Sequence, residues 1–354
     1  MEILYPYHEA IKWNVLNLSQ FLRLKSQQIF LESMAISIGV VGVGFWGSNH
    51  VRVLRELESA EVKAVCDINL ERARYVAKKF GVPSYYRDLD EMLGGEELDA
   101  ITVCTPSVSH AEIAVKILES GLHVFVEKPL ASNPDECLRI IDAAKSNNRF
   151  VMTGFIERFN PAVTKAIELL KAGEIGEVIM SHGRRIGWWP QRIGDVGVVK
   201  DTAIHDIDLT RYIFGQEPVG VYARGGSLRH RFEDHIQAIM TFEDELRVAF
   251  IEANWLTPRK KREMLITGSE GVISIQFLTQ AISLEKADVV IEPIIKWREP
   301  LRIELSHFIE SLLNHRKPLV DAVDGTKAVI IAEAILDSMR RNKPVEIDFE
   351  RFGL

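Results

Sequence analysis

The sequence predicts an α/β protein in two parts: a parallel sheet with helices on both faces, then a second α/β unit with an open, mainly antiparallel sheet. Three observations lead to this prediction. Short β-branched runs alternate with amphipathic stretches from Ile36 to about Thr153, and a glycine-rich turn follows the first run. After Phe155, several strand-like runs follow one another closely. Alternating strands and helices indicate a parallel sheet, whereas clustered strands indicate an antiparallel one.

The composition is typical of a soluble globular protein. The chain has 354 residues, of which 47% are hydrophobic and 26% charged, enough for two domains with a sizeable core. The net charge of −7 argues against a protein that binds nucleic acids without sequence specificity, because such proteins carry a basic face. No apolar run reaches the roughly 18 residues that a membrane span requires. The three widely spaced cysteines indicate reduced thiols in a cytoplasmic protein.

Residues 1–34 form an N-terminal extension ahead of these patterns. The extension lacks the basic segment and apolar core of a secretory signal. Met34 lies just before the first strand, so one interpretation places the natural start there, with residues 1–33 upstream of it. The other interpretation is a helix that packs on the surface. The predicted divisions are residues 1–34, 35–154 and 155–354.

The strands of the first unit are nearly continuous in apolar residues, as expected for parallel strands buried on both faces. They read ISIGVV, EVKAVC, DAITVC, LHVFV and RFVMTG. Helical periodicity marks the segments NLERARYVAKKFG, SHAEIAVKILESG and NPDECLRIIDAAKSN between them. The first two segments end on Gly81 and Gly121, and glycine is common at helix C-termini. The repeat of strand, helix and strand predicts right-handed crossovers.

The second unit begins with a predicted helix over residues 161–172, the strand EVIMSHGRRI and a helix through DTAIHDIDLTRYIFG. The runs VGVYARGG, HIQAIMTF, LRVAFIEANW, REMLITGS and GVISIQ have the spacing of an antiparallel sheet. Helices near residues 304–313 and 325–340 complete the chain. Because no low-complexity linker separates the units, the boundary near Gly154 is a change of architecture, not a flexible tether.

The turn after the first strand has the spacing of a dinucleotide-binding loop. Gly42, Gly44 and Gly47 stand in GxGxxG order, which permits a tight turn, close approach of a pyrophosphate and close helix packing. Asp67 ends the second strand, 20 residues after Gly47, where an acid binds the ribose. No arginine follows Asp67 directly, which favours NAD over NADP. The pattern predicts a Rossmann domain; the alternative is a plain turn with a surface aspartate.

Polar and turn-forming residues stand at the carboxyl ends of the predicted strands, where ligands bind in an open parallel sheet. Thr105–Ser107 follow one strand, Glu127–Pro129 the next, and GFIERFNP the last. We therefore expect them at the rim of one crevice, beside the nicotinamide end of the cofactor. Pro129 would fix the chain there, and the sequence leaves the isomer of the Lys–Pro bond open. For Lys128, the alternative is a solvent-exposed salt bridge.

The segment KDTAIHDID is a candidate for acid–base chemistry. Asp201 and His205 are four residues apart and so share one helical face; Asp208 lies near it, while Asp206 points elsewhere. A carboxylate one turn from a histidine can orient the imidazole and tune its pKa. A helix cap with a hydrogen-bonded histidine is the simpler alternative. A metal site built from Asp201, His205 and Asp208 is disfavoured, because the sequence lacks HExxH and metal-ligand spacing.

Two further segments are candidates for substrate contacts. In GFIERFNP, Arg158 and Asn160 would reach substrate or cofactor, and a structural ion pair is the alternative. RRIGWWPQR combines cations with flat aromatic faces, including Arg185 and Trp189. Such a mixture suits a phosphate plus a ring, whereas paired tryptophans at a strand end also occur simply as packing.

From Ile36 to the C-terminus, the chain resembles the Gfo/Idh/MocA oxidoreductases. The resemblance rests on GVVGVGFWG, VCTPSVSHAEIAVKILESGLHVFVEKPLA, GFIERFNP and DTAIHDID, in family order and spacing. It implies a Rossmann domain and a C-terminal α/β domain whose open sheet face commonly forms dimers or tetramers. It also implies that NAD accepts a hydride from a sugar carbon while the hydroxyl proton leaves to a nearby base.

The resemblance implies three catalytic residues, and the sequence predicts no metal. Lys128 would bond the reacting hydroxyl, Asp201 would position the substrate and the lysine, and His205 would act as acid–base; which of lysine and histidine takes the proton stays open. The expected cofactor contacts are Gly42, Gly44, Phe45, Trp46, Gly47, Asp67, Thr105, Pro106, His110, Glu127 and Lys128. The expected substrate contacts are Lys128, Arg158, Asn160, Arg185, Trp189, Asp201 and His205.

Within the family, GFIERFNPAV and VKDTAIHDIDL are most similar to the UDP-N-acetylglucosamine 3-dehydrogenases. This similarity implies oxidation of the 3-hydroxyl of UDP-N-acetylglucosamine or a close nucleotide sugar. One alternative is an inositol or free-sugar dehydrogenase of the same family. Another is a non-catalytic regulator that senses NAD or a sugar, against which Lys128, Asp201 and His205 together argue. A homodimer or homotetramer is expected.

Overall fold

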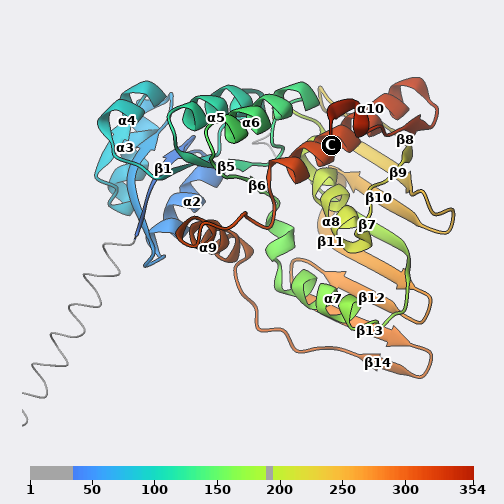
Figure 1. The fold of residues 1–354 in the computed structure, drawn as a ribbon. Coiled ribbons are helices and arrows are strands. Elements are labelled where there is room, and N and C mark those ends of the chain that lie inside the picture. The colour runs from blue at the N-terminus through green and yellow to red at the C-terminus, as the bar shows by residue number, and fades with distance from the viewer. Residues whose placement is uncertain (1–34, 189–193) are drawn as a thin grey trace, which may run out of the picture.

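The computed structural model describes residues 35–188 and 194–354, which form one six-stranded and one nine-stranded sheet with helices packed on them (Figure 1). The predicted extension, residues 1–34, and the candidate substrate contact Trp189 lie outside the described residues. Within the described ranges, no helix is both long and apolar enough to cross a bilayer. Cys66, Cys104 and Cys137 form no disulfide.

The six-stranded sheet confirms the predicted Rossmann fold. Its strands run in the order β3-β2-β1-β4-β5-β6, and all pairs are parallel. The order reverses between β1 and β4, where loops leave in opposite directions and open a ligand crevice. The strands are β1 (Ile36–Val41), β2 (Ala60–Cys66), β3 (Ser84–Tyr86), β4 (Ala100–Val103), β5 (His123–Glu127) and β6 (Val151–Gly154).

Helices cover both faces of this sheet. In Figure 1, α5 and α6 lie above the sheet, and α2 and α9 lie below it. Asn69 caps α3 by accepting from the Arg72 N–H, and Gly81 ends it in the left-handed region. The strand β3 and the short helix α4 were not predicted, since three and seven residues carry too little apolar pattern. The bounds are α2 (Phe45–Arg55), α3 (Leu70–Phe80), α4 (Leu89–Gly95), α5 (His110–Glu119), α6 (Pro134–Ser146) and α9 (Pro300–Leu313).

The nine-stranded sheet has the order β14-β13-β12-β11-β7-β10-β9-β8-β15, in which β7 and β10 pair in parallel and the other pairs are antiparallel. One face is covered by α7 (Pro161–Lys171), α8 (Ile204–Phe214) and α10 (Ala322–Arg341). The prediction of an open, mainly antiparallel sheet is therefore confirmed. The strands are β7 (Val178–Trp188), β8 (Gly220–Gly226), β9 (His235–Thr241), β10 (Val248–Asn254), β11 (Leu256–Gly268), β12 (Val272–Gln276), β13 (Ala281–Lys286), β14 (Val289–Ile291) and β15 (Val345–Glu346).

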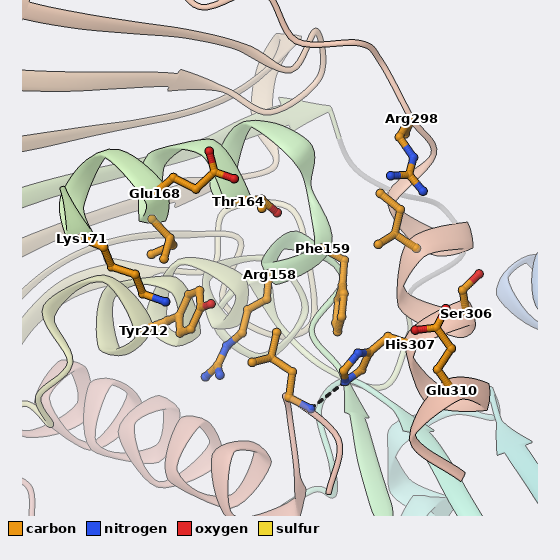
Figure 2. Close-up of a pocket in the computed structure, with 13 residues that line it drawn as sticks. Arg158, Phe159, Thr164, Glu168, Lys171, Tyr212, Arg298, Ser306, His307 and Glu310 are labelled. Atoms are coloured by element: carbon orange, nitrogen blue, oxygen red, sulfur yellow. Dashed lines mark hydrogen bonds between the residues drawn. The ribbon is translucent and has the colours of Figure 1, made fainter. Parts of the chain in front are cut away.

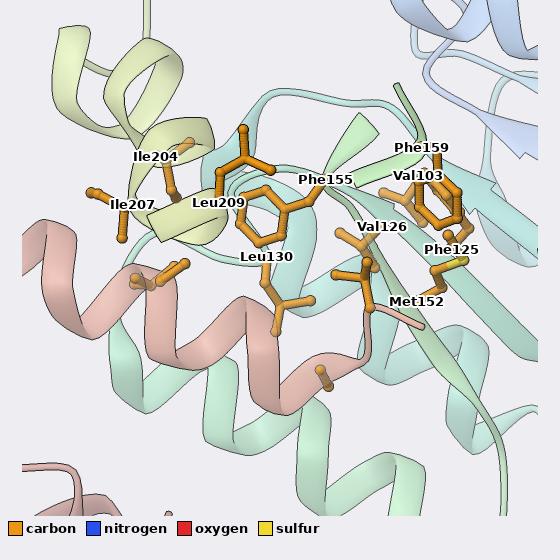
Figure 3. Packing of buried hydrophobic residues seen from close by; sticks show 14 of the residues in the cluster. Val103, Phe125, Val126, Leu130, Met152, Phe155, Phe159, Ile204, Ile207 and Leu209 are labelled. Carbon is orange, nitrogen blue, oxygen red and sulfur yellow. The ribbon is translucent and has the colours of Figure 1, made fainter. Parts of the chain in front are cut away.

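One hydrophobic core joins the ends of β5 and β6 to α8. Figure 3 shows Val126, Met152 and Phe155 continuing into Ile204 of α8 without a break. At Gly325, α10 approaches so closely that a Cβ would lie 2.5 Å from Thr153 Oγ1. Because packed cores resist deformation, the residues before α8 are held in a fixed position relative to β5. The boundary between residues 154 and 155 stays a prediction, since α9 and α10 return to the first sheet.

Candidate active site

The glycine turn between β1 and α2 leaves room for a phosphate. Gly42 has a φ of +82°, and a Cβ on it would lie 2.7 Å from Thr105 N. A Cβ on Gly47 would lie 1.9 Å from the carbonyl oxygen of Gly42. By contrast, a Cβ on Gly44 would meet no described atom within 4 Å, and no described side chain caps α2. The N–H groups of the first turn of α2 therefore face open space, as an anion site requires.

Asp67 stands at the end of β2 and faces this turn. Its Oδ2 accepts from Val43 N–H at 3.0 Å and from Arg72 Nε at 2.8 Å, and its Oδ1 accepts from Arg72 Nη2 at 2.7 Å. Asn69 N–H also donates to Oδ1 at 2.9 Å, so all four acceptor sites of the carboxylate are occupied, and a ribose hydroxyl would have to replace one of these donors. Sequence reasoning overlooked Arg72, which reaches back to Asp67 from the first turn of α3. The only sequence signal for this ion pair was the five-residue spacing between Asp67 and Arg72.

One buried histidine ties together the loops after β4 and β5. His110 Nδ1 lies 2.8 Å from the carbonyl oxygen of Pro129, and Nε2 lies 2.8 Å from that of Thr105. Burial lowers the pKa of His110, so the neutral ring donates to one of these carbonyls at a time. The Lys128–Pro129 bond is cis, the isomer left open by the sequence. His110 thus stabilises the loops after β4 and β5 from the buried side. Pro106, another predicted cofactor contact, is exposed.

Lys128 and Asp201 form an ion pair across the junction of the two sheets. Lys128 Nζ donates to Asp201 Oδ1 at 2.8 Å and to the Asp201 carbonyl oxygen at 2.6 Å. The side chains are only 9% and 11% exposed, so this is not a solvent-exposed salt bridge. Thr202 Oγ1 donates to Asp201 Oδ2 at 3.0 Å. The ammonium is therefore fixed in direction at the end of β5.

His205 reaches the same place through an irregular helix. Val199–Ala203 form a π-helical turn that leads into α8, an arrangement frequent at functional sites. His205 lies in the first turn of α8, is 9% exposed and meets the edge of Phe155 with 6.3 Å between ring centroids. The sequence predicted one helix here, and the wider turn at its start sets the placement of Asp201 relative to His205.

A cavity of about 240 Å³ brings these groups together. Lys128, Asp201 and His205 line it, together with Trp46 from the glycine turn and Glu127. The predicted substrate contacts Asn160 and Arg185 also lie on its wall. Sequence reasoning missed several further lining residues. Glu157 and Thr202 stand inside the quoted segments GFIERFNP and KDTAIHDID, whereas Arg262, Gln280 and Trp297 stand in no recognisable motif.

Arg158, another predicted substrate contact, does not line this cavity. Its Nε and Nη2 donate to the two carboxyl oxygens of Asp208 at 2.8 and 2.6 Å, and Nη2 also donates to Asp324 Oδ1 at 3.1 Å. Figure 2 shows Arg158 beside Tyr212 on the wall of a second pocket, of about 400 Å³. The structure therefore favours the ion pair that the sequence left as the alternative for this arginine.

Arg185 and Asn160 belong to a buried charge cluster in the wall of the cavity. Arg185 is 1% exposed; its Nε donates to Asp206 Oδ1 at 2.8 Å and its Nη1 to Glu157 Oε1 at 2.7 Å. Asn160 Nδ2 donates to Glu157 Oε2 at 3.0 Å. Burial raises the pKa of Asp206 to about 6. Burial also opposes ionisation of Glu157, but Arg185, Arg262 and Asn160 together outweigh it, and the pKa of Glu157 is lowered.

The carboxylates considered for a metal site are engaged by cations. Asp201 pairs with Lys128, and Asp208 pairs with Arg158. In the described part of the chain, no group of three His, Cys, Asp or Glu side chains is arranged to hold a metal ion.

The same sequence segments and architecture occur in known proteins. Residues 36–155 match an oxidoreductase family with an NAD-binding Rossmann fold, GFO/IDH/MocA, and residues 163–274 match the C-terminal domain of that family. The chain belongs to the Gfo/Idh/MocA oxidoreductase family. As a member of this family it is an NAD-dependent dehydrogenase.

Relatives of this Gfo/Idh/MocA protein cover most of its length. The scyllo-inositol 2-dehydrogenase (NAD(+)) of Bacillus subtilis (strain 168) is 29% identical over 333 residues, 89% of this chain and 97% of that protein. An uncharacterised oxidoreductase of Streptococcus pneumoniae serotype 4 is 31% identical over 254 residues, 68% of each chain. The structure of UDP-N-acetylglucosamine 3-dehydrogenase from Acidithiobacillus ferrooxidans matches with a TM-score of 0.80 and 26% identity, over 87% of this chain and 98% of that chain.

The residues around the glycine turn fit the NAD of this family. The open space at Gly44 and the uncapped start of α2 suit the pyrophosphate, and Asp67 directly follows β2, where the ribose-binding acid of this fold lies. Thr105 and Glu127 would border the nicotinamide end, at the carboxyl ends of β4 and β5. When bound, NAD supplies the hydride acceptor.

Proposed function

We propose that this dehydrogenase oxidises a ring hydroxyl of a sugar or polyol to a ketone. The observation that carries the proposal is the Lys128–Asp201 pair, which stands with His205 on the wall of one cavity at the carboxyl edge of the parallel sheet. Hydride transfer from a carbon requires the proton of its hydroxyl to leave, and a cation and a histidine beside that hydroxyl serve this step. The same grouping argues against a non-catalytic regulator.

The geometry gives each of these residues a role. A lysine ammonium has three N–H donors, and Asp201 accepts two of them through Oδ1 and its carbonyl oxygen. The third donor is available to the oxygen of the reacting hydroxyl, whose proton it acidifies. Asp201 fixes the direction of that donor. His205, or Lys128 after losing a proton, accepts the hydroxyl proton.

For the substrate, we propose UDP-N-acetylglucosamine, oxidised at its 3-hydroxyl, or a close nucleotide sugar. The resemblance of residues 154–163 and 199–209 to that branch supports it, as does the likeness to the Acidithiobacillus ferrooxidans enzyme. The second candidate is inositol or another free polyol, which the 29% identity to the Bacillus subtilis scyllo-inositol dehydrogenase supports.

Mass spectrometry of UDP-N-acetylglucosamine incubated with the enzyme and NAD tests this proposal. We expect a product lighter by one pair of hydrogen atoms, formed in step with nicotinamide absorbance, and competition by UDP. Oxidation of myo-inositol or scyllo-inositol in the same assay, with UDP-N-acetylglucosamine untouched and UDP without effect, would instead establish the second candidate.

We also propose that two or four copies assemble through the uncovered face of the nine-stranded sheet. This face exposes Met180, Ile239, Phe250 and Leu265, an apolar group of the kind that marks interaction surfaces. Light scattering after gel filtration should give a dimer or tetramer, and Phe250→Glu should shift it toward monomer. A monomeric wild-type protein would contradict the proposal.

A further inference from the structure

Arg262 lines the same cavity as Lys128, but its guanidinium makes no hydrogen bond to any described residue. The nearest carboxylate oxygen, Glu157 Oε1, is 3.8 Å away. Arg262 stands on β11 directly opposite Arg185 on β7. Side chains of directly opposite residues lie on the same face of a sheet, so both arginines point toward α8 and the cavity.

The carboxylates near Arg262 accept hydrogen bonds from other side chains. Glu157 accepts from Arg185 at 2.7 Å and from Asn160 at 3.0 Å, and Asp206 accepts from Arg185 at 2.8 Å. An arginine carries five N–H donors, and the side chain of Arg262 is 34% exposed, so these donors can be reached from the cavity. Partial burial, and then the nearby Arg185 charge, lower the pKa of Arg262. The guanidinium is thus a strong donor set directed at the cavity.

We infer that Arg262 recognises an anionic group of the substrate: a phosphate or carboxylate on the sugar whose hydroxyl bonds to Lys128. This inference rests on the proposed function and names the charge of its substrate. A planar guanidinium binds such groups through paired, charge-assisted hydrogen bonds, which are stronger than bonds to the hydroxyls of a neutral polyol.

Other residues around the cavity suit the same ligand. Trp46 and Trp297 stand on its wall, and Trp297 is 59% exposed, so a flat ring is available to a sugar or base. Arg259 also stands on β11 and is exposed, but it does not line the cavity, so it serves as a matched control for Arg262.

Steady-state kinetics of Arg262→Gln, Arg262→Lys and the matched control Arg259→Gln test the inference. The substrates are UDP-N-acetylglucosamine, glucuronic acid and myo-inositol, and NADH fluorescence titration checks that each variant keeps its cofactor site. For the charged substrate, Arg262→Gln should lower kcat/KM by about 10–100-fold, chiefly through KM. Arg262→Lys should recover part of the loss, since lysine keeps the charge without the planar fork. The exposed Arg259→Gln should differ little.

The three substrates separate the outcomes. A loss on UDP-N-acetylglucosamine assigns the contact to a phosphate, and a loss confined to glucuronic acid assigns it to a carboxylate. If both Arg262 variants keep the wild-type kcat/KM on the charged substrate, the inference is wrong and the proposed function still stands. If Arg262→Gln loses NADH binding, the kcat/KM of Arg262→Lys alone tests the inference. A wild-type enzyme that oxidises only myo-inositol would remove both the nucleotide-sugar proposal and this inference.

Discussion

Lys128→Met is the perturbation that tests the catalytic assignment most directly. Methionine keeps most of the length of the side chain but removes the ammonium, whose Nζ lies 2.8 and 2.6 Å from two Asp201 oxygens. Positioned acid–base groups contribute about 10²–10⁴-fold to rates. We therefore expect kcat to fall by that factor, equivalent to about 3–5 kcal/mol on the barrier.

The same change should also cost stability. Asp201, which is 11% exposed, would lose its charged partner. Removing the partner of a buried polar group lowers the free energy of unfolding by about 1–3 kcal/mol. A melting temperature lower by several degrees is expected. NADH affinity should hardly change, because Lys128 lies at the end of β5 and the glycine turn follows β1. Initial rates from NADH absorbance, fluorescence titration and thermal melting measure the three effects separately.

Lys200→Met is the matched control. Lys200 Nζ donates to the Ser132 carbonyl oxygen at 2.6 Å and pairs with Glu333, yet Lys200 does not line the cavity. This control should also lower the melting temperature while kcat stays near the wild-type value. A Lys128→Met enzyme that binds NADH and retains more than about a tenth of wild-type kcat would refute the reasoning, since an acid–base role demands a larger loss.

Two further predictions concern the glycine turn and acid stability. Gly47→Ala places a Cβ 1.9 Å from the Gly42 carbonyl oxygen and should lower both the melting temperature and the NADH affinity. The Cβ of Gly44→Ala meets no described atom within 4 Å, so this variant should weaken only NADH binding. Equal melting temperatures for the two variants would contradict this prediction. Burial lowers the pKa of His123 to about 4, and Phe150 N–H donates to its Nδ1 at 2.9 Å. Because the unfolded pKa is about 6.5, stability present above that pH is lost as the pH falls toward about 4. Thermal melting across this range should show the loss, and a smaller one in His123→Asn, which accepts the same N–H without titrating; an equal loss would count against His123.

Elements with a strong local period were predictable from the sequence. β1, β2, β4 and β5 are buried on both faces and therefore read as apolar runs. β15 has two residues and β14 three, and such short pairings depend on the neighbouring strand rather than on their own residues. The return of α9 to pack beside α2 was likewise unpredicted, because no local pattern records which layer a helix joins.

By itself, the sequence determined the dinucleotide-binding turn at Gly42–Gly47, the acid at the end of β2, and the candidate groups Lys128, Asp201 and His205. The turn and the acid follow from their spacing along the first two strands, whereas the catalytic roles of Lys128, Asp201 and His205 follow from the resemblance to the family. The tertiary structure alone decided that Arg158 pairs with Asp208, 50 residues away, and that Arg262 joins the cavity wall. Contacts of this kind depend on how a helix packs on a sheet and which strands become neighbours. Those are properties of the whole fold, which the spacing of residues within one segment does not encode.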